Sequence, residues 1–164
     1  MKKILAYSSM FLVVMMAVIA VSADGANFSG TWVLDASKST MPQGPGGGGG
    51  QVTLTVTQDA KTLTSVRKTE RGEQTSKYNL DGSKATNTLT GRMEGTAVST
   101  AKWQGDGKIL EINTDTTASM QGNEFKMTSV AHWELADGGK TLKIHTKSET
   151  PQGARESTMV YTKQ

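Results

Sequence analysis

A chain of 164 residues is long enough for one domain of ordinary size, and its lack of cysteine excludes a disulfide framework. The net charge of only +3 removes the main argument for nucleic-acid binding, which requires a concentrated basic face. We therefore expect a domain held together by its own hydrophobic core, with no nucleic-acid partner.

The first 23 residues have the pattern of a secretory signal peptide. The basic pair Lys2-Lys3 precedes an apolar stretch from Met10 to Val21. The small residues at Val21-Ser22-Ala23 suit a signal peptidase, so cleavage would leave Asp24 first. The alternative is an uncleaved anchor, but a dozen apolar residues is shorter than the roughly 20 that a membrane-spanning helix needs. We expect an exported protein, periplasmic or extracellular, with no stable membrane span after cleavage.

The mature part, residues 24–164, is expected to be a single domain. Removing 23 of the 164 residues leaves 141, and the net charge falls to +1 because the signal carries two lysines and no acids. One segment, residues 41–51, stands apart in composition because it contains the glycine run Gly46–Gly50. Glycine loses the most entropy on ordering, so we expect a flexible surface loop there. No Gly-Lys-Ser/Thr follows the run, which argues against phosphate binding.

The rest of the mature chain has a period of two. Val52, Leu54 and Val56 alternate with threonines, and a second strand is expected from Thr62 to about Thr69. Turn signals recur every 10 to 15 residues, and no amphipathic helix is visible. We expect an all-β fold: an antiparallel up-and-down meander closed into a barrel of about eight to ten strands, because closure removes exposed strand edges.

One hairpin can be registered from its pattern, with a turn at Asp137–Lys140. Matching the apolar faces of its two strands also gives a favourable charge pair on the outer face. The expected partners are Leu135 with Leu142, Trp133 with Ile144, and Glu134 with Lys143.

The same register sets His132 opposite His145, the two histidines of the chain. A metal would need at least a third ligand, and the shared face offers acids but also lysines that repel a cation. The acids are Glu134 and Glu149; the lysines are Lys143 and Lys147. We interpret the histidines as solvated side chains on a polar face and expect no metal site.

Catalytic motifs are missing as well. Cysteine is absent, no Gly-x-Ser-x-Gly occurs, and neither Ser157 nor the threonines have a visible activating arrangement. We expect no catalytic residues and no cofactor.

Seven aromatic residues remain after signal removal, each in an expected strand: Phe28, Trp32, Tyr78, Trp103, Phe125, Trp133 and Tyr161. Such residues either anchor a core or line a cavity. Small side chains are common here, and a small barrel can hold one ligand. The residues we expect in a ligand-binding wall are Trp103, Phe125, Trp133, Met159 and Tyr161.

Two segments carry a family resemblance. Phe28-Ser29-Gly30-Thr31-Trp32-Val33-Leu34 resembles the first strand of the lipocalin and fatty-acid-binding protein superfamily, the calycins. Thr158-Met159-Val160-Tyr161-Thr162-Lys163 is similar to the last strand of the intracellular fatty-acid-binding proteins. The resemblance implies a calycin barrel in which Gly30 and Trp32 form a structural plug at the narrow end.

A closer resemblance is to small secreted bacterial proteins with a lipocalin-like domain. It lies in Gly30-x-Trp32-x-Leu34-Asp35-x-Ser37-Lys38-Ser39 and in Trp133-x-Leu135-x-Asp137-Gly138-Gly139-Lys140-Thr141-Leu142.

The departures from the family bear on function. The glycine-rich loop stands where fatty-acid-binding proteins have a helical lid, and Met159 stands where they have a carboxylate-binding arginine. Of the family's residues that bind the ligand carboxylate, only the tyrosine is kept, as Tyr161. The resemblance therefore implies a neutral apolar ligand, or none, rather than a fatty acid held by its head group.

Three functions remain open from the sequence. The first is an exported module that binds a small lipophilic molecule. The second is a filled, non-catalytic barrel that acts as a structural or protein-interaction module, whose protein partner the sequence does not name. The third is a small outer-membrane barrel. It is less favoured, because the chain ends in Lys163-Gln164 instead of an aromatic residue and has too few aromatic residues for two interfacial girdles.

Overall fold

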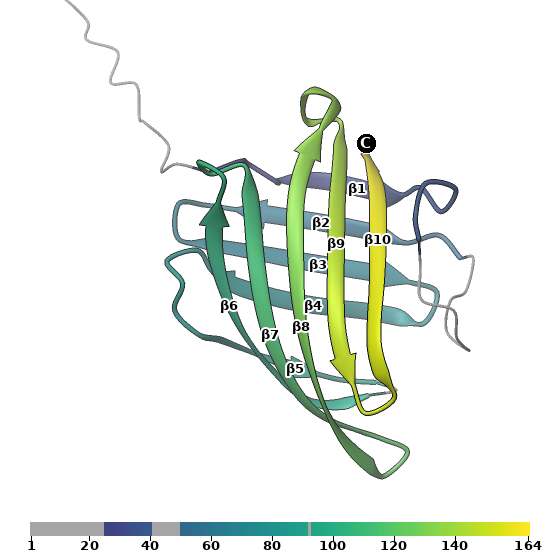
Figure 1. Cartoon of the computed structure of the whole chain (residues 1–164). Coiled ribbons are helices and arrows are strands. Elements are labelled where there is room, and N and C mark those ends of the chain that lie inside the picture. Colours follow the sequence, from purple (N-terminus) through teal and green to yellow (C-terminus); the bar gives the residue numbers. More distant parts are fainter. Residues whose placement is uncertain (1–24, 41–49, 92) are drawn as a thin grey trace, which may run out of the picture.

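The computed structural model describes residues 25–40, 50–91 and 93–164 (Figure 1). The expected signal peptide and most of the glycine-rich loop lie outside these ranges. Within them, ten strands and one short 3-10 turn form, and no helix is long and apolar enough to cross a membrane. The strands are β1 (Gly30–Leu34), β2 (Thr53–Gln58), β3 (Thr62–Thr69), β4 (Gly72–Asn79), β5 (Ala85–Leu89), β6 (Glu94–Gln104), β7 (Ile109–Met120), β8 (Asn123–Ala136), β9 (Thr141–Thr150) and β10 (Gly153–Lys163).

All ten strands belong to one antiparallel sheet, in the order β4-β3-β2-β1-β10-β9-β8-β7-β6-β5. Neighbours in sequence pair with each other, and β1 also pairs with β10, so the first and last strands join. Figure 1 shows β1–β4 crossing β6–β10, with the sheet curled into a nearly closed barrel. The expected antiparallel meander of eight to ten strands is confirmed, with ten strands.

Side chains join the two ends of the sheet, β4 and β5, which share no backbone ladder. The amide of Asn87 on β5 is the main link, because it accepts from Lys77 N at 2.7 Å and donates to Lys77 O at 3.0 Å. Gln74 and Asn79 on β4 donate further bonds to the β5 segment, to the carbonyls of Thr88 and Lys84. A buried asparagine thus imitates one rung of a strand ladder.

The hairpin of β8 and β9 has the register expected from its apolar pattern. Leu135 pairs with Leu142, Trp133 with Ile144, and Glu134 with Lys143. The turn at Asp137–Gly139 has positive φ at all three residues, which explains the two consecutive glycines.

Apolar side chains point into the barrel and form its core. The largest fully buried ones are Trp32, Tyr161, Phe28, Leu63, Leu110, Leu142 and Val56. Exposed positions between them carry lysine, threonine and glutamate.

Candidate functional site

One end of the barrel interior is sealed around Trp32, the residue assigned to the narrow end by resemblance. Its side chain is 0% exposed, and the indole Nε1 donates a hydrogen bond to Phe28 O at 2.9 Å. The ammonium of Lys163 lies 5.1 Å from the Trp32 ring. Gly30 is part of the same closure, since its φ is +142° and a Cβ would lie 2.8 Å from Lys163 Cε.

An aromatic cluster extends this seal and includes two of the five residues expected to line a ligand. Trp103 stacks on Phe28 with 5.9 Å between ring centroids, and Trp133 packs edge-on against Phe28 at 5.8 Å. Tyr78 packs against the other side of Trp133 at 6.3 Å. Burial raises the pKa of the Tyr78 phenol, and hydrogen bonding with the hydroxyls of Ser76 and Ser65 offsets part of this rise.

Two more expected wall residues lie together on β10. Tyr161 is 1% exposed, and its hydroxyl donates to Met159 Sδ at 3.4 Å. Met159 is half-buried and pairs with Ile144, which in turn pairs with Trp133, so the register sets Met159 and Trp133 in one row.

Phe125 does not join the other four. It lies eight residues from Trp133 along β8, a distance of about 27 Å. There it lines a separate depression of about 390 Å³ between the β7–β8 and β9–β10 turns, with Met120 and Pro151. Alternation correctly predicts that Phe125 shares a face with Trp133, but it does not tell how far apart the two lie.

Beyond the seal, several inward-facing positions are only half-buried. Ser129 and Ala131 share the inner face of β8 with Trp133, and Thr146 pairs with Ala131 from β9. Their side chains are small, so they leave surface on the inner wall accessible beside Met159. Sequence reasoning did not single them out, although the alternation of β8 places two of them inside.

Arg67 is a charged residue on the inner wall that sequence reasoning missed. On β3 it follows Leu63 and Ser65, both buried, at the same side of the strand, and it pairs with the buried Leu54 of β2. It nevertheless remains exposed, and it lines a depression of about 140 Å³ with Val52, Thr69 and Glu70, among others.

The positive charge of Arg67 acts on the phenol of Tyr161. Burial raises the pKa of the Tyr161 phenol, while the positive charge of Arg67 and its hydrogen bonding to the phenol lower it. The expectation of a neutral apolar ligand, or none, which was drawn from Met159, stays a prediction.

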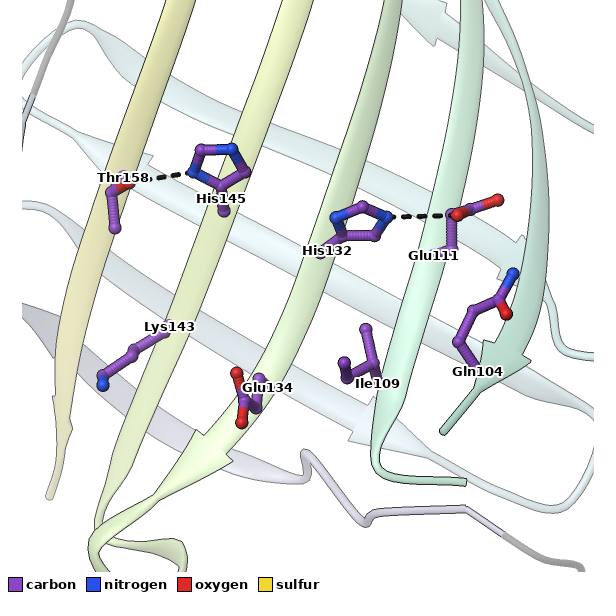
Figure 2. A pocket seen from close by; sticks show the side chains of 8 residues that line it. All are labelled: Gln104, Ile109, Glu111, His132, Glu134, Lys143, His145 and Thr158. Carbon is purple, nitrogen blue, oxygen red and sulfur yellow. Dashed lines mark hydrogen bonds and ion pairs between the residues drawn. The ribbon is translucent and has the colours of Figure 1, made fainter. Parts of the chain in front are cut away.

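The outer face of β6–β10 has a depression of about 470 Å³, shown in Figure 2. Glu111, His132, His145 and Thr158 form one row across it in register, and the expected pairing of the histidines is confirmed. Figure 2 shows the two imidazoles engaged on opposite sides, His132 with Glu111 and His145 with Thr158.

The acids that bind these histidines differ from those that the sequence offered. His132 Nε2 lies 3.1 Å from Glu111 Oε2, and His145 Nε2 lies 3.0 Å from Glu156 Oε1. Hydrogen bonds from His132 and Asn113 hold the pKa of Glu111 below its ordinary value. In the described part of the chain, no group of three or more histidine, aspartate or glutamate side chains is placed to hold a metal.

Thr158, His145 and Glu156 form a hydroxyl–imidazole–carboxylate chain that the sequence did not reveal. His145 Nδ1 lies 3.0 Å from Thr158 Oγ1, and Nε2 contacts Glu156. A nucleophilic triad also needs donors for the oxyanion, often including the amide of the nucleophile. Thr158 N instead donates to Thr40 O at 2.9 Å, so its own amide is not free for that role.

Comparisons with known proteins show the fold. No protein-family model matches the sequence, and no curated protein matches it. Among solved structures, the zebrafish ileal bile acid-binding protein complexed with cholic acid is 13% identical with a TM-score of 0.56, and the match covers 84% of this chain and 98% of that one. Lipid binding protein 8 of Caenorhabditis elegans is 12% identical with a TM-score of 0.54, covering 84% and 95%.

A third similar structure carries a different description. It is an abundant heat soluble (SAHS) protein of Ramazzottius varieornatus, 10% identical with a TM-score of 0.56, covering 87% of this chain and all of that one. The structure is thus a calycin-like β-barrel, as the sequence resemblance implied. Identities this low establish the fold alone.

Proposed function

We propose that this protein is an exported, non-catalytic carrier that binds a small lipophilic molecule inside the barrel. The observation that carries the proposal is the contrast between the two ends of the inner wall. Around Trp32 the interior is sealed, whereas Ser129, Ala131, Thr146 and Met159 face inward and remain half-buried. A ligand seated on these side chains would remove their apolar atoms from water.

Barrel width supports the same proposal. Eight strands already give an interior that side chains just fill or that holds one small ligand, and diameter grows with strand number. This barrel has ten strands, and its inner wall away from the aromatic cluster is built largely from serine, alanine and threonine. Side chains of this size fill less of the added width than large apolar side chains would.

The described ligands of proteins with similar structures also support the proposal. One is described as a fatty acid transporter and another as a bile acid-binding protein in complex with cholic acid. These descriptions, together with the half-buried inner wall of this chain, support a carrier role. An outer-membrane barrel is disfavoured, because apolar side chains here point inward while lysine, glutamate and threonine occupy outward positions.

Ligand uptake can be tested with a pair of substitutions at adjacent positions on β8. Ser129→Phe fills the inner wall, while Thr128→Phe adds the same ring to the exposed outer face. We expect wild type and Thr128→Phe to take up a fluorescent apolar probe, and Ser129→Phe, still folded by circular dichroism, to lose most of the uptake. Equal uptake by all three, or none by the wild type, would contradict binding inside the barrel.

Native mass spectrometry of protein purified from its host provides an independent test. A co-purifying small lipophilic molecule supports the carrier role. The same preparation tests export. We expect a soluble periplasmic or secreted protein whose measured mass is that of a chain beginning at Asp24. An intact chain in the cytoplasm, or recovery in the outer membrane, would overturn the export part of the proposal.

A further inference from the structure

We infer that the ligand carries an uncharged hydroxyl group partway along its apolar body, and that the hydroxyls of Thr116, Ser129 and Ser148 bind this group. The inference rests on the proposed function, because it specifies the chemistry of the molecule held inside the barrel. It adds to the expectation of a neutral ligand a polar group that lies away from both ends of the molecule.

A row of hydroxyl side chains crosses the inner face of four neighbouring strands. In register order from β6 to β9, the row consists of Ser99, Thr114, Ser129 and Ser148. Each member lies on the same side of its strand as a core residue, because side chains two or four positions apart share a face. These core residues are Ala101, Ile112, Trp133 and Ile144. The row is therefore a polar band on the inner wall, and on β8 it lies midway between Trp133 and Phe125.

Two members of the row bond to each other and two have no protein partner. Ser99 Oγ and Thr114 Oγ1 lie 2.9 Å apart and form a hydrogen bond. The side chains of Ser129 and Ser148 make no hydrogen bond to any other described residue, although their residues pair in register and are half-buried. Their hydroxyls are available to a molecule inside the barrel.

Thr116, which follows Thr114 on the inner side of β7, shows that the inner wall borders accessible space. Its residue is only 5% exposed, and its neighbours in register, Ala97 and Met127, carry no side-chain oxygen or nitrogen. Its hydroxyl has no hydrogen bond among the residues that the structure describes, yet in this part of the chain every fully enclosed side-chain oxygen has one. The Thr116 oxygen therefore faces space that a water molecule can enter, and a buried hydroxyl of this kind gains from a partner.

The neutral side chains of the row favour an uncharged partner. The row continues to Arg155 on β10, but that guanidinium is exposed and donates to Gln152 in the turn before the strand. Removing an ion from water to face hydroxyls alone costs more than their hydrogen bonds return. A ligand hydroxyl is uncharged, and it both donates and accepts, so it can bond to two of these side chains at once.

A ligand without such a group is expected to bind less tightly. Before a ligand binds, water satisfies the inner hydroxyls, and a ligand that displaces this water has to replace its hydrogen bonds. A fully apolar body would leave the hydroxyls of Thr116, Ser129 and Ser148 unpaired. Sites with polar groups placed for a ligand hydroxyl discriminate against the analogue that lacks it for this reason.

The experiment compares methyl 12-hydroxystearate with methyl stearate, two neutral ligands that differ by one mid-chain hydroxyl. Affinities are measured by displacement of a fluorescent apolar probe from protein purified after expression of the full chain. Wild type is expected to bind the hydroxylated ester about tenfold more tightly. Thr116→Val keeps the shape of the side chain and should reduce this preference at least about threefold. Thr117→Val makes the same change on the exposed outer side of β7 and should keep the preference.

Unfolding in urea provides a second measurement on the same pair of variants. Because the Thr116 hydroxyl has no protein partner, Thr116→Val should leave the unfolding midpoint unchanged or raise it. A midpoint well below that of Thr117→Val would contradict the absence of a partner. Ser129→Ala provides the binding test should Thr116→Val not fold, and it should reduce the preference in the same way while keeping the affinity for methyl stearate.

Two further outcomes overturn the inference in distinguishable ways. If wild type binds the probe but shows no preference for the hydroxylated ester, or if Thr116→Val and Ser129→Ala both keep that preference, the carrier function stands and the hydroxyl site is wrong. If wild type binds neither the probe nor either ester, the proposed function fails and the hydroxyl site falls with it.

Discussion

Replacing Trp32 with alanine tests how the closed end of the barrel is held together. The side chain is fully buried in the hydrophobic core, lies under the Lys163 ammonium and donates to the Phe28 carbonyl. A buried tryptophan removes about 150–250 Å² from water, which is about 4–6 kcal/mol by area as an upper bound. Large-to-small substitutions of this kind cost about 3–5 kcal/mol in cores that relax partly, and we expect that range here.

Trp32→Phe separates packing from hydrogen bonding. It keeps an aromatic ring in the seal but removes the indole donor, so the Phe28 carbonyl loses its partner. An unpaired buried acceptor costs about 1–3 kcal/mol, so this variant should be destabilised less than Trp32→Ala. It also keeps the experiment informative if the alanine variant does not fold, since whole domains are stable by only about 5–15 kcal/mol.

The assay is equilibrium unfolding in urea followed by far-ultraviolet circular dichroism, because tryptophan fluorescence would itself change with the substitution. The midpoint should fall for both variants, more for alanine, at an unchanged slope. A loss below about 1 kcal/mol for Trp32→Ala would refute the view that this residue seals the barrel.

Three further predictions concern the sheet and its outer face. Asn87→Ala should destabilise by about 1–3 kcal/mol and speed hydrogen exchange in β4, because it leaves the partly buried backbone donor and acceptor of Lys77 unpaired. Gln74→Ala removes an exposed link across the same gap and should cost less, so equal losses would contradict the bridging role of Asn87. Gly95→Ala should destabilise the protein more than Gly72→Ala. Both glycines have positive φ, but a Cβ at Gly95 would collide with the backbone of β7, whereas a Cβ at Gly72 would meet open space. Equal unfolding midpoints of the two variants would refute the collision. The pKa of Glu111 is lowered in the folded protein, so its contribution to stability is present above the ordinary pKa of 4.5 and is lost as pH falls through the folded value. Glu111→Gln should therefore make the unfolding midpoint depend less on pH between about pH 5 and pH 3. An unchanged pH dependence would contradict the contact between Glu111 and His132.

Sequence reasoning worked best where strands are adjacent in the chain. Alternation and turn chemistry were sufficient to place His132 opposite His145 and the turn at Asp137, because a hairpin's register depends on a few neighbouring residues. Extending the same counting by one strand on each side would have placed Glu111 and Thr158 in that row.

It failed where the fold brings distant strands together. Tyr78 and Trp133 pack together from β4 and β8, which are not neighbours in the sheet, and no local pattern measures the distance across a barrel. The closure of β4 onto β5 is likewise made by one amide side chain, which reads as an ordinary polar residue in the sequence. Phe125 was placed on the correct face at the wrong depth for the same reason.

Strand β10 shows why register governs function in this molecule. Thr158 faces outward to His145, while Met159 and Tyr161 face inward, so a slip of one residue would exchange the two sets. Residues 35–40, just after β1, bond to the backbone of β10 and so help to hold that register.

In that segment, Thr40 exchanges backbone hydrogen bonds with Thr158, and Ser39 Oγ accepts from Val160 N at 2.9 Å. Asp35 in turn holds the segment's bend, because its carboxylate accepts from Ser37 N and Oγ at 3.1 and 2.6 Å. The Asp35-x-Ser37-Lys38-Ser39 motif, part of the closer family resemblance, therefore has a structural role. It holds β10 in the register that places Tyr161 inside the barrel, where its hydroxyl bonds Met159.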